Sequence, residues 1–149
     1  MQLKFERDFF IRPARGSDQK ECLILIQKYH SGQVYEDISA RFMSFLEKPD
    51  LFFKVLLNSN GMLIGVCIAH QTQILTLAIN VNFLRREVRD EISRELKDWA
   101  KAQNAGKISV PRELIAGDWK RYFKQKGVKI ESSVKSDPKG TSIKILEFT

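Results

Sequence analysis

The chain has 149 residues, of which 43% are hydrophobic and 29% are charged, a balance typical of a soluble globular protein. This is about the length of one domain, so we expect residues 1–149 to form a single domain with its own core. No apolar run approaches the roughly 20 residues that a membrane-spanning helix needs. The charged start, MQLKFERDFF, is unlike a signal peptide.

The cysteines and histidines are few and dispersed. Cys22 and Cys67 stand far apart in apolar stretches, which is typical of small buried residues rather than of a disulfide. His30 and His70 are equally isolated, and a metal site needs three or four convergent ligands. The sequence therefore predicts no metal site, and it favours a reducing cytoplasmic or intracellular setting.

The net charge of +7 is unevenly distributed along the chain. Residues 82–149 hold 16 of the 25 Lys and Arg residues but only 10 of the 18 Asp and Glu residues. A basic surface is expected along and just after the last helix, from Lys120, Arg121, Lys124, Lys126 and Lys129. Such an excess is compatible with a polyanionic partner such as nucleic acid, but many cytosolic enzymes are equally basic.

The first third of the chain predicts a strand and two helices. A β-rich run at 9–14 stops at Pro13, and Asp18 then stands where it can cap a helix, with Glu21 three residues later. A second helix follows the break at 30–33 and ends before Pro49.

Three apolar runs then predict an antiparallel meander of strands at 51–57, 62–70 and 74–81. Asn60-Gly61 is a strong hairpin signal between the first two. Because the runs are almost continuously apolar, both faces of the sheet should be covered.

The rest of the chain alternates helices and strands. A helix at 84–104 carries apolar residues in steps of three and four, and the strand 107–110 after it should lie parallel to 74–81. A last helix at 112–126 and two final strands follow. Trp99 and Trp119, one on each of these helices, should be largely buried. The order is β-α-α-β-β-β-α-β-α-β-β, a mixed α/β fold with one central mixed sheet.

This order resembles the fold of the GCN5-related N-acetyltransferases, the GNAT superfamily, over nearly the whole chain. Three phrases carry the resemblance: IRPARGSD at 11–18, ELKDWAKAQNAGKISV at 95–110 and WKRYFKQKGV at 119–128. They are similar, in order and spacing, to the family's opening strand, its central helix with the following strand, and its last helix. The resemblance implies an acyl-coenzyme A N-acyltransferase fold.

The resemblance also implies where acetyl-coenzyme A would bind. In the family its pyrophosphate sits on backbone N–H groups at the start of the central helix, in a loop whose glycines allow close approach. The matching positions here hold Arg85, Glu87 and Arg89. Glu87 would repel a phosphate by on the order of 1 kcal/mol. The loop is thus degenerate, and we expect a dissociation constant for acetyl-coenzyme A above about 100 μM.

The candidate cofactor-binding residues all belong to this strand-to-helix junction: Val81, Arg85, Arg86, Val88 and Arg89. Arg85 and Arg89 are four residues apart and could hold one anion together in place of the glycine loop. The alternative is a solvated helix face on which these arginines pair with neighbouring acidic residues. The sequence leaves both interpretations open.

The candidate catalytic residue is Tyr122. Many members of the family use a tyrosine on the last helix as general acid, and the matching position here is Phe123. Tyr122 is adjacent, but one step around a helix is about 100° of rotation, so it should face elsewhere and pack with Trp119. The strand at 74–81 contains no acidic residue to serve as the family's general base.

These features favour a GNAT-fold protein that works as a non-catalytic binding or structural module, with no cofactor expected and a protein partner or assembly. Short acetyltransferase-like proteins of tailed phages, including virion components, are similar to this chain in the changed loop. The alternatives are an active acyl-coenzyme A-dependent N-acetyltransferase, which would use acetyl-coenzyme A, and a protein that binds nucleic acid or another polyanion. No membrane partner is expected.

Overall fold

The computed structural model describes residues 9–29, 33–70, 73–80, 82, 86–103, 106–111, 118–136 and 142–147. Its helices and strands follow the predicted order, with one short 3-10 turn added before the first helix. They are β1 (Phe9–Pro13), η1 (Gly16–Asp18), α1 (Gln19–Tyr29), α2 (Gln33–Leu46), β2 (Phe52–Asn58), β3 (Leu63–His70), β4 (Gln73–Ile79), α3 (Arg86–Ala102), β5 (Lys107–Pro111), α4 (Asp118–Gln125), β6 (Lys129–Ser136) and β7 (Ser142–Glu147).

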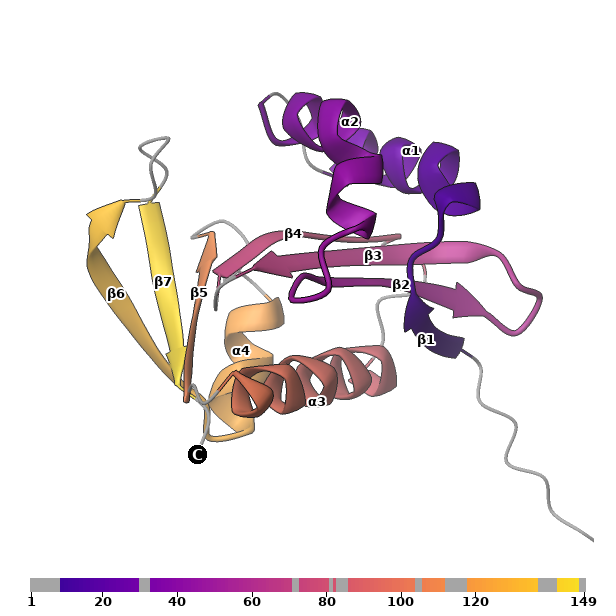
Figure 1. Ribbon diagram of the computed structural model, residues 1–149. Helices are drawn as coiled ribbons and strands as arrows, with labels where there is room; N and C mark the ends of the chain where they lie inside the picture. The colour runs from indigo at the N-terminus through magenta and orange to yellow at the C-terminus, as the bar shows by residue number, and fades with distance from the viewer. Residues whose placement is uncertain are drawn as a thin grey trace, which may run out of the picture.

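The strands form one seven-stranded mixed sheet in the order β1-β2-β3-β4-β5-β7-β6. β4 and β5 are parallel neighbours connected through α3, as predicted, and every other neighbouring pair is antiparallel. Strands β5, β7 and β6 form a wing that turns away from β1–β4 (Figure 1). The predicted meander of β2, β3 and β4 is confirmed.

Helices cover both faces of the sheet, with α1 and α2 on one side and α3 and α4 on the other (Figure 1). Two apolar clusters fill the two interfaces. The α1–α2 side is built around residues such as Ile26, Phe42 and Ile68, and the α3–α4 side around Leu96 and Trp119. The nearly continuous apolarity of β2 and β3 follows from this burial, because both of their faces lie inside the protein.

The hairpin between β2 and β3 forms at the predicted turn. Gly61 has a φ of 81°, a left-handed conformation that glycine adopts without steric cost. The Asn58 side-chain oxygen accepts hydrogen bonds from the N–H groups of Asn60 (3.0 Å) and Met62 (2.9 Å). The turn thereby satisfies backbone donors that have no strand partner.

Asp18 does not act as the simple helix cap that the sequence predicts. Its carboxylate turns back toward β1, where it accepts two hydrogen bonds from the Arg12 guanidinium, at 2.8 and 2.9 Å, and one from the Arg15 N–H at 2.8 Å. The 3-10 turn before α1 places the Asp18 carboxylate within reach of the Arg12 side chain and the Arg15 N–H. Asp18 is only 6% exposed, so this residue anchors β1 to the start of α1.

The two tryptophans differ in burial. Trp119 is 8% exposed and lies in the core, as predicted. Trp99 is only partly buried, which corrects the expectation that it is largely buried. It packs against Phe52 with ring centroids 5.7 Å apart and lies at the border of a surface groove. Helical spacing alone cannot show that this end of α3 reaches the rim of the sheet.

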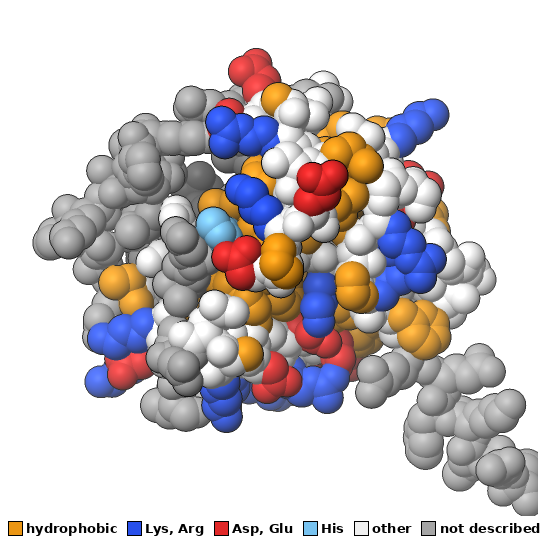
Figure 2. Space-filling view, in the orientation of Figure 1, with side chains coloured by type: hydrophobic (Ala, Val, Ile, Leu, Met, Phe, Trp, Pro, Cys, Tyr) orange, Lys and Arg blue, Asp and Glu red, His pale blue; other side chains and the backbone are white. Residues whose placement is uncertain are grey.

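Both cysteines are buried free thiols, as predicted. Burial raises the pKa of each thiol to about 12, so neither is a reactive thiolate at neutral pH. Charged side chains of both signs are interspersed with apolar ones on the face shown in Figure 2. Within the described ranges, every helix is too short or too polar to span a bilayer.

Candidate functional site

The candidate site lies where β4 ends and α3 begins. Val81 and Arg85 are outside the described residues, and so is most of the connection between the two elements. Just before it, the Asn80 N–H donates to the Ile64 carbonyl at 2.8 Å, and the Asn80 side chain accepts a bond from the Asn82 N–H at 3.1 Å. The proposed clamp of Arg85 with Arg89 therefore stays a prediction.

The first turn of α3 contains the other candidates. Arg86 and Glu87 are exposed, whereas Val88 is 3% exposed and lies in the core, so Val88 can offer a ligand only its backbone. The guanidinium of Arg89 lies 5.8 Å from the centre of the Trp119 ring, which directs this side chain toward α4. Only Arg86 presents an exposed cation at this end of the helix in the part of the chain that the structure describes.

The junction between β4 and β5 is the weakest part of the sheet. The two strands share one register pair, Gln73 with Ser109, whereas β5 and β7 share five. Beyond Gln73, the edge of β4 that faces away from β3 has no strand partner in the described part of the chain. We call this opening the β4–β5 fork. Its backbone N–H and C=O groups need other partners.

A bulge in β4 lies beside the fork. Ala69 of β3 pairs with Ile74 and Ile68 pairs with Thr76, so Leu75 is an extra residue without a partner on β3. Bulges re-aim side chains and are over-represented next to active sites. Thr76 is fully buried, and its hydroxyl has no hydrogen-bond partner among the described residues. A buried hydroxyl without a hydrogen-bond partner lowers the stability of the fold. Nothing in the sequence of β4 distinguishes Thr76 from its apolar neighbours as a residue of the site.

Replacing Thr76 by the isosteric valine is expected to raise the free energy of unfolding by about 1 kcal/mol, because the unsatisfied hydroxyl is removed without loss of volume. Chemical denaturation of the two proteins measures the difference. Thr76→Ser, which keeps the hydroxyl and loses a methyl group, should instead destabilise the protein. A Thr76→Val variant less stable than the parent would mean that the hydroxyl has a stabilising partner.

Tyr122 is held by a residue of α3. Its hydroxyl donates a hydrogen bond to the Asp90 carboxylate at 2.5 Å, and Lys126 lies 3.3 Å from the same oxygen. Burial, with the nearby Asp90 carboxylate, raises the pKa of Tyr122 well above its ordinary value. The hydrogen bond from Tyr122 lowers the pKa of Asp90. Tyr122 therefore keeps its proton and links α4 to α3.

The aromatic residues of α4 pack as the sequence predicts. The Tyr122 and Trp119 rings meet edge to face with centroids 5.8 Å apart, and Phe123 stacks on Trp119 at 5.3 Å. Phe123, at the position of the family's catalytic tyrosine, is 2% exposed. The expected start of the last helix at 112–117 lies outside the described residues.

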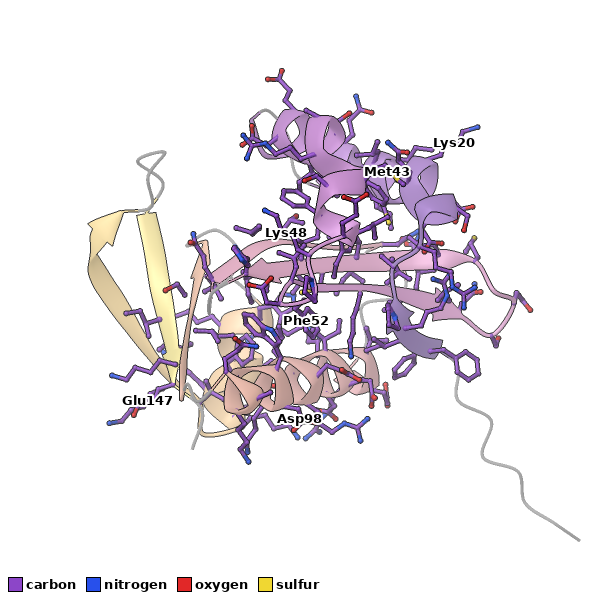
Figure 3. All side chains as sticks on the ribbon, viewed as in Figure 1. Lys20, Met43, Lys48, Phe52, Asp98 and Glu147 are labelled. Atoms are coloured by element: carbon purple, nitrogen blue, oxygen red, sulfur yellow. The ribbon has the colours of Figure 1, made fainter. Side chains whose placement is uncertain are left out.

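A surface groove lies on the α3–α4 side of the sheet, between the start of β2 and the second half of α3. This groove of about 420 Å³ contains an ion pair between Lys54 and Glu95, 2.6 Å apart. Figure 3 shows Phe52 between the sheet and α3. The pair joins residues 41 positions apart, so no local pattern could have identified it. Within the described ranges, no group of three or more His, Cys, Asp or Glu side chains converges.

Comparison with known proteins gives the same fold. No family model and no curated protein matches the sequence. Among solved structures, Ard1 from Thermoplasma volcanium is 14% identical, with a TM-score of 0.68 over 96% of this chain and 99% of that one. A GNAT-family acetyltransferase from Staphylococcus aureus is 10% identical, with a TM-score of 0.68 over 95% and 99%.

A third similar structure is the PaiA N-acetyltransferase from Thermoplasma acidophilum in complex with coenzyme A. It is 12% identical, with a TM-score of 0.66 over 95% of this chain and 100% of that one. At such identities the likeness is one of architecture. It covers both halves of the sheet and all four helices, and the chain therefore has the fold of the GNAT acetyltransferases.

Proposed function

We propose that this chain binds an acyl-coenzyme A thioester at the β4–β5 fork and transfers the acyl group to an amine. The observation that carries the proposal is the single register pair between β4 and β5 in an otherwise well-paired sheet. The pantetheine arm of coenzyme A contains two amides and can pair with a free strand edge as an added strand would. The solved neighbour with coenzyme A supports the choice of ligand.

The chemistry needs few side-chain groups. The amine nitrogen attacks the thioester carbonyl, the new C–N bond forms, the C–S bond breaks, and the amine proton passes to solvent while coenzyme A leaves as the thiol. An amine that is already deprotonated is a competent nucleophile, so most of the rate would come from holding the two reactants together. Backbone N–H groups at the fork would stabilise the developing oxyanion.

Binding is expected to be weak, with a dissociation constant for acetyl-coenzyme A above about 100 μM. The first turn of α3 offers backbone donors and a positive dipole to the pyrophosphate. Arg86 adds an exposed cation there, but the exposed Glu87 opposes the same anion. Turnover would therefore be seen at millimolar acetyl-coenzyme A rather than at micromolar concentrations.

Replacing Glu87 by glutamine is expected to tighten acetyl-coenzyme A binding about fivefold, because removal of a nearby like charge is worth on the order of 1 kcal/mol. Calorimetry of the parent and the variant measures this ratio. Glu36→Gln, an equal charge change at an exposed position on α2, should leave the affinity unchanged. Equal effects of the two substitutions would show that only net charge matters.

Release of free thiol from 2 mM acetyl-coenzyme A with lysine-containing peptides or polyamines as acceptors tests transfer itself. Amine-dependent thiol release supports the proposal, and its absence despite binding contradicts catalysis. That second outcome would favour the other candidate, a non-catalytic binding module. One observation favours this candidate: the Tyr122 hydroxyl is engaged by Asp90, and Phe123 has no hydroxyl, so neither offers a free phenol to a leaving group.

A further inference from the structure

The segment around α4 is unusually basic. Residues 118–131 contain five cations and two acidic residues, Asp118 and Glu131, which stand at the two ends of the run. All five side chains are exposed, whereas Trp119, Tyr122 and Phe123 point into the core. We call these cations the α4 basic face: Lys120, Arg121, Lys124, Lys126 and Lys129.

Local helix energetics do not account for this face. Cations near the C-terminus of a helix are favourable because of the helix dipole, and this explains Lys124. Lys120 and Arg121, however, lie in the first turn of α4, where the same dipole disfavours positive charge. In the part of the chain that the structure describes, no carboxylate pairs with Lys120, Lys124 or Lys129. Within the described side chains, these three lysines therefore carry charge that no ion pair uses.

The opposite side of the molecule is balanced in charge. Helices α1 and α2 together contain three cations and three acidic residues. Lys20 and Lys48 lie on that side, across the sheet from α3 and α4 (Figure 3). The run of cations along α4 thus has no counterpart on the α1 and α2 helices.

We propose that the α4 basic face binds the phosphate backbone of a nucleic acid strand. Lys120 and Lys124 are four residues apart on the helix, so their side chains are neighbours and can meet successive phosphates. Because the aromatic rings of α4 are buried, no platform for base stacking is present on this helix. The contacts would be to phosphate, and binding would not depend on base sequence.

The neighbouring groove extends this face toward α3. It has a volume of about 340 Å³ and is lined by Arg94 and Lys97 of α3 together with Tyr122 and Lys126. Lys126 belongs to both the groove and the α4 basic face. Its partner Asp90 stays charged and also accepts the Tyr122 hydrogen bond, so the described lining of the groove has three cations and one carboxylate. A strand that crosses α4 could thus place a further phosphate in the groove.

Fluorescence anisotropy with a labelled single-stranded 20-mer, as RNA and as DNA of the same sequence, tests the proposal. Five phosphate contacts predict a loss of affinity of roughly 100-fold between 50 and 200 mM KCl. The triple variant Lys120→Glu, Arg121→Glu, Lys124→Glu is expected to bind at least tenfold more weakly. The control triple Lys20→Glu, Arg41→Glu, Lys48→Glu makes the same change in net charge on exposed positions of the α1–α2 side and should cost less than threefold.

Circular dichroism and thermal unfolding of both triples verify that they fold. Equal losses in the two triples would overturn the proposal, because only net charge would then matter. Absence of binding by the parent at 50 mM KCl would overturn it as well. So would tighter binding of an acidic peptide than of either oligonucleotide, or displacement of the RNA by acetyl-coenzyme A, which would assign these cations to another ligand.

Discussion

Replacing Leu96 by alanine is expected to lower the free energy of unfolding by about 3–5 kcal/mol. Leu96 is fully buried on the inner face of α3, in one row with Val88, Ile92 and Ala100. Its removal leaves a cavity between α3 and the sheet that the packed neighbours cannot fill. Urea denaturation measures the loss.

Trp99→Ala is the matched comparison for Leu96→Ala. Although the indole is the larger group, Trp99 is only partly buried, and its ring N–H is buried with no partner in the described ranges. Its removal should therefore cost about 2 kcal/mol, less than complete burial would imply. A Trp99→Ala variant less stable than Leu96→Ala would show that Trp99, and not the buried row, holds α3 on the sheet.

Replacing Arg12 by alanine is expected to cost about 2–4 kcal/mol, because it leaves the buried carboxylate of Asp18 without its charged partner. Of the hydrogen bonds in the described part of the chain, Asp18 would keep the one from the Arg15 N–H. Arg15→Ala is the matched control, since the exposed Arg15 side chain is lost while its N–H remains. It should cost less than about 0.5 kcal/mol. Similar losses in both variants would contradict the assigned role of Arg12.

The Arg12 substitution also has a defined pH dependence. The hydrogen bonds from Arg12 hold the pKa of Asp18 below its ordinary value. A carboxyl whose folded-state pKa is lowered stabilises the fold above its unfolded-state pKa, about 3.9, and loses this contribution as the pH falls through the folded-state value. The stability difference between the parent and Arg12→Ala should therefore be full at pH 7 and shrink below about pH 4.

The element order, the meander of β2, β3 and β4 and the parallel pairing of β4 with β5 could be predicted because each segment has a strong local pattern. The Asn60-Gly61 turn fixes the β2–β3 hairpin, and the apolar spacing of Val88, Ile92 and Leu96 fixes the buried face of α3. Because consecutive helices and strands are usually neighbours in space, few ways of connecting these elements remain. The fold therefore follows from local patterns and general rules of chain connection.

The details of the candidate site could not be predicted in the same way. The bulge at Leu75 lies in an uninterrupted apolar run, where no residue type signals an extra position. The partner of Tyr122 is Asp90, 32 residues away, and such a pair depends on how two helices meet. Asp18 has the spacing of a helix cap, yet Arg12 offers it a stronger, charged partner. These outcomes were decided by tertiary contacts.

The single register pair between β4 and β5 also bears on how the chain acquires its structure. Strands β1–β4 pair through antiparallel ladders, and β2, β3 and β4 follow one another directly along the chain. The parallel pairing of β4 with β5 can form only after α3 has brought β5 back to the sheet. Because so little backbone pairing crosses that junction in the described part of the chain, cooperativity between the two parts of the sheet depends on apolar residues such as Ile108 and Val110 packing beside Leu96. The sheet is thus continuous in topology but divided in its hydrogen bonding, and the C-terminal part can form and open as a separate cooperative unit.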